Sequence, residues 1–179
     1  MPRISPVVAP QPETPLAATL QQIKASLGKI PNAYATLAHS PAALDGYLAF
    51  SAALRKGRLT ARQRELLALA ISQANECQYC LSAHTVTGKM AGLTPEQIRD
   101  ARAGQSADPL EHAILAFALK AMQQRGMLSD EDMKAARAAG VDDGLMIEII
   151  AHIALLTVTN YVNRLADPKI DFPAVPTQL

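Results

Sequence analysis

The sequence predicts an all-α fold, a compact bundle of about seven to eight helices. Three observations support this prediction: apolar residues recur at helical spacing, no segment shows the alternating pattern of a strand, and aromatic residues make up only 4% of the chain. With 179 residues, 49% of them hydrophobic, the chain is long enough for one domain with its own core.

The chain is predicted to consist of an N-terminal arm and one helical domain. Residues 1–13 are expected to be extended, either frayed or laid across a neighbouring surface, because they contain Pro2, Pro6, Pro10 and Pro12. Residues 14–179 are expected to form a single all-helical domain.

Polar capping residues mark the expected helix starts. Several of them are followed by proline, which suits the first helical turn; the candidates are Thr14, Ser40, Thr60, Thr94, Asp108 and Ser129. The last helix is expected from about Asp143 to Leu165, before Pro168.

Two pairs of segments resemble each other within the chain. Residues 93–103 resemble residues 128–138, and Glu65–Ala68 resembles Glu148–Ala151. Either an internal duplication or the general likeness of amphipathic helices explains these similarities.

Charge and hydropathy exclude some classes of partner. Lys+Arg 17 against Asp+Glu 16 gives a formal charge of +1, so no nucleic-acid partner is expected. The N-terminus lacks the apolar run of a signal peptide, and the most apolar segment, residues 146–162, is interrupted by Glu148, His152 and Asn160. We therefore expect no membrane partner and a cytoplasmic location, where a CxxC pair is typically redox-active or metal-binding.

Both cysteines lie in one short stretch with a histidine. Cys80 follows Cys77 by three positions and His84 follows Cys80 by four, so a helix would place the three side chains on one face. A bend at residues 73–76 would start a new helix near Cys77 and fold Glu65 back over it. The alternative for Glu65 is a solvated side chain unrelated to the cysteines.

The spacing predicts which thiol attacks. A free thiol has a pKa of about 8.5, and lowering it by about two units requires roughly 2.7 kcal/mol. A helix N-terminus supplies only about 0.3–1 kcal/mol, so a neighbouring base is needed. Because His84 lies one turn from Cys80, Cys80 is the predicted attacking thiol and Cys77 the resolving one.

Two other hypotheses for the motif remain. Cys77 and Cys80 could be structural thiols, or they could bind zinc together with His84 and Glu65. The favoured hypothesis involves no metal and no organic cofactor.

The pattern E-x11-C-x-x-C-x3-H, formed by Glu65, Cys77, Cys80 and His84, resembles the motif of the AhpD-like alkylhydroperoxidases of the carboxymuconolactone decarboxylase superfamily. The all-helical setting, from about Ala42 to Leu165, agrees with this family, and residues 40–84 are similar to the peroxidase-related branch of the superfamily. One position departs from the family: some members have a second histidine inside the motif, where this chain has Tyr79.

The resemblance implies a peroxidase. Cys80 would attack a peroxide substrate, Cys77 would form a disulfide with it, and His84, oriented by Glu65, would relay protons. An external dithiol, lipoylated or thioredoxin-like, would reduce the disulfide, and the subunits would assemble into trimers or hexamers. A decarboxylase-type lyase is the alternative within the superfamily, although that branch does not generally depend on a CxxC pair.

The last helix carries further polar residues. His152 is expected to be a core histidine with its hydrogen bonds satisfied. Asn163 is expected to serve packing at the polar end of this helix.

Overall fold

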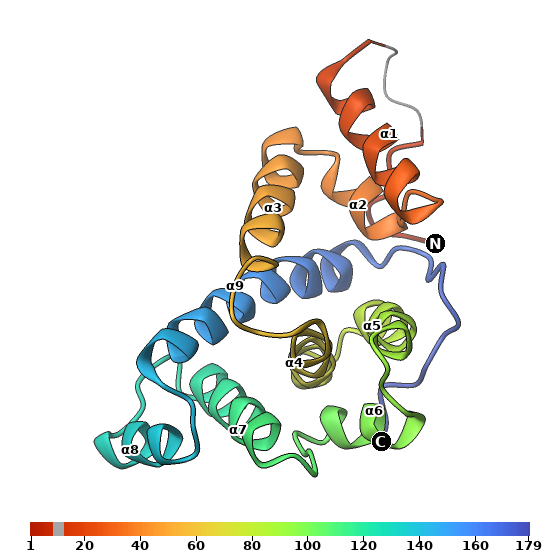
Figure 1. Cartoon of the computed structure of the whole chain (residues 1–179). Helices are drawn as coiled ribbons and strands as arrows, with labels where there is room; N and C mark the ends of the chain where they lie inside the picture. Colours follow the sequence, from red (N-terminus) through yellow and green to blue (C-terminus); the bar gives the residue numbers. More distant parts are fainter. Residues whose placement is uncertain (9–12) are drawn as a thin grey trace.

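The computed structural model describes residues 1–8 and 13–179, and within them the protein is all-α, as predicted, with nine helices and no strand (Figure 1). The helices are α1 (Pro15–Leu27), α2 (Asn32–Leu37), α3 (Pro41–Leu54), α4 (Ala61–Ala74), α5 (Gln78–Met90), α6 (Pro95–Arg102), α7 (Pro109–Gln123), α8 (Asp130–Ala138) and α9 (Asp143–Ala166).

The predicted capping residues start their helices. Thr60 is the N-cap of α4 and forms a capping box with Gln63: the Gln63 amide donates to Thr60 Oγ1 at 3.2 Å, and the Thr60 amide donates to Gln63 Oε1 at 3.0 Å. Asp108 caps α7 by accepting a hydrogen bond from the Glu111 amide at 2.9 Å. These local signals therefore fix where α4 and α7 begin.

The short helix α2 was not predicted from the sequence. Its N-cap is Pro31, which supplies no side-chain hydrogen bond, and its six residues span fewer than two turns. A segment of this length is too short to show a helical period. Ala33, Ala35 and Leu37 are nevertheless buried, so tertiary packing stabilises this helix.

Helix α9 crosses the middle of the molecule, with α2 and α3 on one side and α4 and α7 on the other (Figure 1). Helix α4 contributes the most continuous buried segment, residues 66–72, and packs against α5, α6, α7 and α9. The main core therefore lies around α4 and α9. The residues from which a site could be built lie on these two helices and on α5.

The apolar length of α9 corrects one sequence expectation. The polar interruptions in residues 146–162 led us to expect no segment that could span a membrane. By length and composition, however, α9 is long and apolar enough to cross one. No other helix in the described part of the chain meets this criterion. Its contacts with α2, α3, α4 and α7 explain this composition, because a central core helix is apolar on several faces.

Both terminal segments lie on the helical body. In the arm, the amides of Arg3 and Ile4 donate to the Ala166 carbonyl at the end of α9, and the Val7 amide donates to the Ala35 carbonyl. Pro10 and Pro12 lie outside the described residues. The C-terminal tail, residues 167–179, runs past α5 and ends beside α6 (Figure 1).

Candidate active site

A sharp bend between α4 and α5 brings the predicted site residues together. Asn75 is the C-cap of α4, Glu76 has a φ of 52°, and Cys77 is the N-cap of α5. A positive φ is uncommon for a residue other than glycine, and here it reverses the chain within two residues. The predicted bend is therefore present, and α5 packs back along α4.

The fold places Glu65 beside His84. Oε2 of Glu65 lies 2.9 Å from Nδ1 of His84 and also accepts a hydrogen bond from Thr87 Oγ1 at 2.6 Å. Burial alone would raise the pKa of Glu65, but the charge of His84 and the hydrogen bonds from His84 and Thr87 lower it below the usual value. Glu65 is therefore an ionised partner for the imidazole and not a solvated surface residue.

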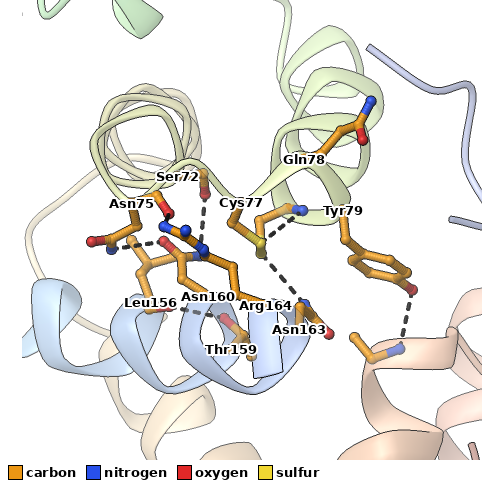
Figure 2. Close-up of a disulfide and its surroundings, with 12 residues drawn as sticks. Ser72, Asn75, Cys77, Gln78, Tyr79, Leu156, Thr159, Asn160, Asn163 and Arg164 are labelled. Atoms are coloured by element: carbon orange, nitrogen blue, oxygen red, sulfur yellow. Dashed lines mark hydrogen bonds between the residues drawn. A yellow bond between two sulfur atoms is a disulfide. The ribbon is translucent and has the colours of Figure 1, made fainter. Parts of the chain in front are cut away.

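The two cysteines are joined by a disulfide at the start of α5, with 5.3 Å between their Cα atoms (Figure 2). Both are buried, Cys77 with 1% and Cys80 with 3% of its surface exposed. The Cys80 amide donates to Cys77 Sγ at 3.3 Å, so Cys77 acts as the N-cap of the helix. In the part of the chain that the structure describes, no hydrogen bond links His84 to either sulfur.

Asn163 is a neighbour of Cys80 whose contact the sequence did not reveal. Its Nδ2 lies 3.4 Å from Cys80 Sγ, while its Oδ1 is buried without a hydrogen-bond partner (Figure 2). The two residues are 83 positions apart. The periodicity of α9 showed only that Asn163 lies on the polar end of an apolar helix, where it was expected to serve packing.

The two cysteines line different cavities. Cys80, Glu65 and His84 line a cavity of about 670 Å³, a size typical of sites for small organic molecules. Cys77 lines a separate pocket of about 210 Å³. Tyr79 and Asn163 line both and form the wall between them.

Tyr79, which replaces the second histidine of some family members, connects the motif to the C-terminal tail. Its hydroxyl donates to Asp171 Oδ1 at 2.6 Å and accepts from the Ala33 amide at 3.1 Å. Burial and the hydrogen bond to Asp171 raise its pKa above the usual value, so it stays protonated. Its ring also packs edge-on against Phe172 at 5.7 Å. Tyr79 is thus a hydrogen-bonding wall residue and not a base.

His152 differs from its expectation. It is buried, with 4% of its surface exposed, but its Nε2 has no hydrogen-bond partner, and it lines the same cavity as Cys80. Burial lowers its pKa below the usual value, so the ring is neutral near pH 7. His152 is therefore not a satisfied core histidine.

Comparison with known proteins shows similarity to one family over part of the chain. The model of the carboxymuconolactone decarboxylase family matches residues 41–124. The structure of an AhpD alkylhydroperoxidase core, an uncharacterized peroxidase-related protein from Ralstonia eutropha JMP134, superposes with a TM-score of 0.80 at 26% identity over 95% of this chain and 93% of that one. Residues 41–124 thus match the carboxymuconolactone decarboxylase family, and the whole chain is similar to an AhpD-like structure.

Two further solved structures share the fold. A peroxidase-related protein from Silicibacter sp. TM1040 has a TM-score of 0.76 at 21% identity, with 97% of this chain and 94% of that chain covered. The debrominase Bmp8, as a Cys-to-Ala variant in complex with 2,3,4-tribromopyrrole, has a TM-score of 0.73 at 21% identity, with 94% and 91% covered. A search of curated proteins finds no significant match.

Proposed function

We propose that this protein is a thiol-dependent peroxidase in which Cys80 reduces an organic hydroperoxide and Cys77 resolves the product. The observation that carries the proposal is the different surroundings of the two sulfurs. Cys80 lines the large cavity together with Glu65 and His84, whereas Cys77 lies within disulfide distance but opens to the small pocket. The AhpD-like relative of 26% identity supports a peroxidase-related role.

The reaction has two steps in the protein. The Cys80 thiolate attacks the terminal oxygen of ROOH, the O–O bond breaks, and the alkoxide takes a proton to leave as ROH, with Cys80 oxidised to a sulfenic acid. The Cys77 thiol then attacks the sulfenic sulfur, which releases water and forms the disulfide. His84 supplies the proton to the leaving alkoxide, and Glu65 orients and stabilises the charged imidazole.

Asn163 supports this assignment of Cys80. A hydrogen bond from its Nδ2 stabilises a thiolate more than a thiol, because bonds to charged groups are stronger than neutral ones. In the reduced protein the same contact would favour the thiolate form of Cys80. Its unpartnered Oδ1 is available to accept the O–H of a hydroperoxide.

Reduction of the disulfide requires an external dithiol. The first thiolate of the donor attacks one sulfur to form a mixed disulfide, and the second thiol then releases the donor in oxidised form, leaving Cys77 and Cys80 as thiols. Lipoylated or thioredoxin-like proteins of a reducing cytoplasm are donors of this class. Because both cysteines are buried, a dithiol carried on a long, narrow group, such as a lipoyl arm, reaches the disulfide more readily than a dithiol on a flat protein surface does.

The outer face of α9 provides a subunit interface. A stripe of exposed apolar side chains at helical spacing runs along this helix, formed by Ile147, Ile150, Val158, Tyr161 and Leu165. An exposed apolar face of this length is typical of a protein–protein contact. A second copy of the chain is the proposed partner, in a homo-oligomer such as the trimers or hexamers that the family resemblance implies.

The zinc hypothesis requires at least three converging ligands. Within residues 1–8 and 13–179, no group of three or more His, Cys, Asp or Glu side chains has the geometry of a metal site. The lyase hypothesis predicts an activity that survives the loss of Cys80.

Turnover of an organic hydroperoxide with dithiothreitol as electron donor tests the proposal. We expect wild type to consume cumene hydroperoxide catalytically and Cys80→Ser to lose this activity completely. Cys77→Ser should lose turnover but still react once. Retention of peroxidase activity in Cys80→Ser would contradict the proposal.

A further inference from the structure

The large cavity extends along one face of α9. His152, Leu155, Leu156, Thr159 and Asn163 line it at spacings that share a helix face. His152 and Asn163 are eleven residues apart, which corresponds to about 16 Å along a helix that rises about 1.5 Å per residue. Because Asn163 contacts Cys80, the reactive sulfur lies at one end of this face and His152 marks the other.

Two arginines line the cavity with His152. Arg55 is the C-cap of α3. The chain just after it lies beside α9, because the Arg58 amide donates to Glu148 Oε2 at 2.8 Å. Glu148 lies one helical turn before His152 on α9. Burial is the largest cause of the lowered pKa of His152, and the charge of Arg64, on α4, also lowers it. Arg55 and Arg64 therefore converge on the His152 end of the cavity.

Neither arginine forms a salt bridge with a carboxylate among the residues that the structure describes, although the charge of Arg64 helps to lower the pKa of Glu65. Arg64 donates to the Leu59 carbonyl, and no salt bridge is formed by Arg55. Glu148 accepts hydrogen bonds from the Arg58 and Leu59 amides with its two oxygens, and its negative charge acts on the pKa of His152 in the opposite direction to Arg64. This end of the cavity is cationic and has an unpartnered buried nitrogen, Nε2 of His152.

The carboxylates that line the cavity are occupied elsewhere. Glu65 is bonded to His84 and Thr87, and Asp171 is bonded to Tyr79 and paired with Lys29 at 3.2 Å. The lining also contains apolar residues, among them Leu155 and Leu156, which lie between His152 and Asn163 on α9, and Ala68, Ala83 and Val86 from α4 and α5. The cavity thus combines a redox end, an apolar middle and a cationic end.

We propose that this cavity binds an apolar organic hydroperoxide that carries a carboxylate, with the carboxylate at Arg55 and Arg64 and the hydroperoxide at Cys80. Guanidinium groups suit carboxylates because they offer paired N–H donors in one plane. The neutral His152 ring adds a donor at Nε2 in the corresponding tautomer. This inference rests on the proposed function for the reacting group, but the anion subsite is a separate property of the cavity.

A matched pair of substrates tests the anion subsite. The hydroperoxide of linoleic acid and that of its methyl ester differ only in charge at the end remote from the peroxide. We expect wild type to show a KM for the acid about tenfold lower than for the ester, with similar kcat. Arg55→Gln should remove the difference by raising the KM for the acid alone. Lys56→Gln, an adjacent exposed residue that does not line the cavity, should leave it unchanged.

A binding measurement separates this inference from the proposed function. Linoleic acid and its methyl ester, which carry no peroxide, can be titrated against the disulfide form of the protein. Preferential binding of the acid that is lost in Arg55→Gln would support the subsite even if no hydroperoxide oxidised the thiols. Equal affinity for acid and ester in wild type, or equal weakening of both by Arg55→Gln, would overturn it.

Discussion

Nδ1 of His84 lies 2.9 Å from Oε2 of Glu65, although the two residues are 19 positions apart on different helices. The reversal at Glu76 and Cys77 makes this contact possible, because it packs α5 along α4. The contact fixes which ring nitrogen faces the carboxylate and leaves Nε2 as the atom that would exchange protons with substrate in the proposed reaction.

Replacing Glu65 with Gln should slow the peroxidatic step. The amide cannot stabilise a charged imidazole, so we expect the rate of Cys80 oxidation by cumene hydroperoxide to fall about 10- to 100-fold at pH 7. Stopped-flow measurement of thiol loss provides the rate. The control is Glu76→Gln, since Glu76 is exposed and only pairs with Arg164 at 3.5 Å. A rate within twofold of wild type for Glu65→Gln would exclude the relay.

The same pair predicts a pH dependence of stability. The pKa of Glu65 is lowered in the folded protein, so its ionised form contributes stability that is fully present above about pH 4.5, the unperturbed value, and is lost as the pH falls through the folded pKa. We expect the stability advantage of wild type over Glu65→Gln to disappear on acidification. Urea unfolding between pH 3 and pH 7 measures it. An advantage that persists unchanged at pH 3 would contradict the prediction.

Asn163→Leu should raise the pKa of the Cys80 thiol. A hydrogen bond to a charged group is worth about 1.5–3 kcal/mol, which corresponds to roughly one to two pH units. The pKa is measured in a Cys77→Ser background from the pH dependence of iodoacetamide alkylation. Asn160→Leu is the matched control, because the buried Asn160 contacts Ser72 and Asn75 but no sulfur (Figure 2). A purely structural role of Asn163 would destabilise the fold without moving this pKa.

Tyr79→Phe should loosen the C-terminal tail. The variant loses the hydrogen bond to Asp171 and leaves the Ala33 amide without its acceptor, at a cost of about 1–3 kcal/mol. We expect a lower Tm and faster proteolysis of residues 168–179, detected by mass spectrometry. Tyr161→Phe, at an exposed position of α9, should behave like wild type in both measurements. Unchanged proteolysis of Tyr79→Phe would show that other contacts retain the tail.

A charge on the outer face of α9 should disrupt the proposed homo-oligomer. Val158→Glu places an acidic group in the middle of the exposed apolar stripe, where burial against a second copy would be strongly unfavourable. Light scattering coupled to size exclusion measures the mass of the particle. We expect a multimer for wild type and a monomer for the variant. A monomeric wild type would contradict the proposed interface.

Local signals in the sequence predicted much of this fold. Thr60 with Gln63, and Asp108 before Pro109, are capping patterns that act within one turn, so they can be read without tertiary information. The bend at Glu76 was also predicted, because polar residues interrupt the apolar pattern there. Helix α2 was missed since it depends on packing and not on a periodic pattern.

Only the part of the candidate site that lies in one continuous motif was predictable from the sequence. The motif of Cys77, Cys80 and His84 occupies one short stretch of the chain. His152 and Asn163 lie on α9, more than 65 positions after that motif, and line the same cavity as Cys80. Their roles depend on how α9 packs against α4 and α5, and one sequence gives no signal for such a contact. An unpartnered polar atom in a buried side chain becomes visible only in three dimensions.

Intact mass and thiol count in a single turnover test the central claim most directly. Reduced protein is mixed with one equivalent of cumene hydroperoxide, and the same is done with Cys77→Ser. We predict that wild type loses two thiols and about two mass units, the hydrogens released on forming the Cys77–Cys80 disulfide, and that Cys77→Ser stops with one oxygen on Cys80. Thiols that remain unmodified in wild type, or an oxygen found on Cys77 in a Cys80→Ser variant at the wild-type rate, would contradict the account.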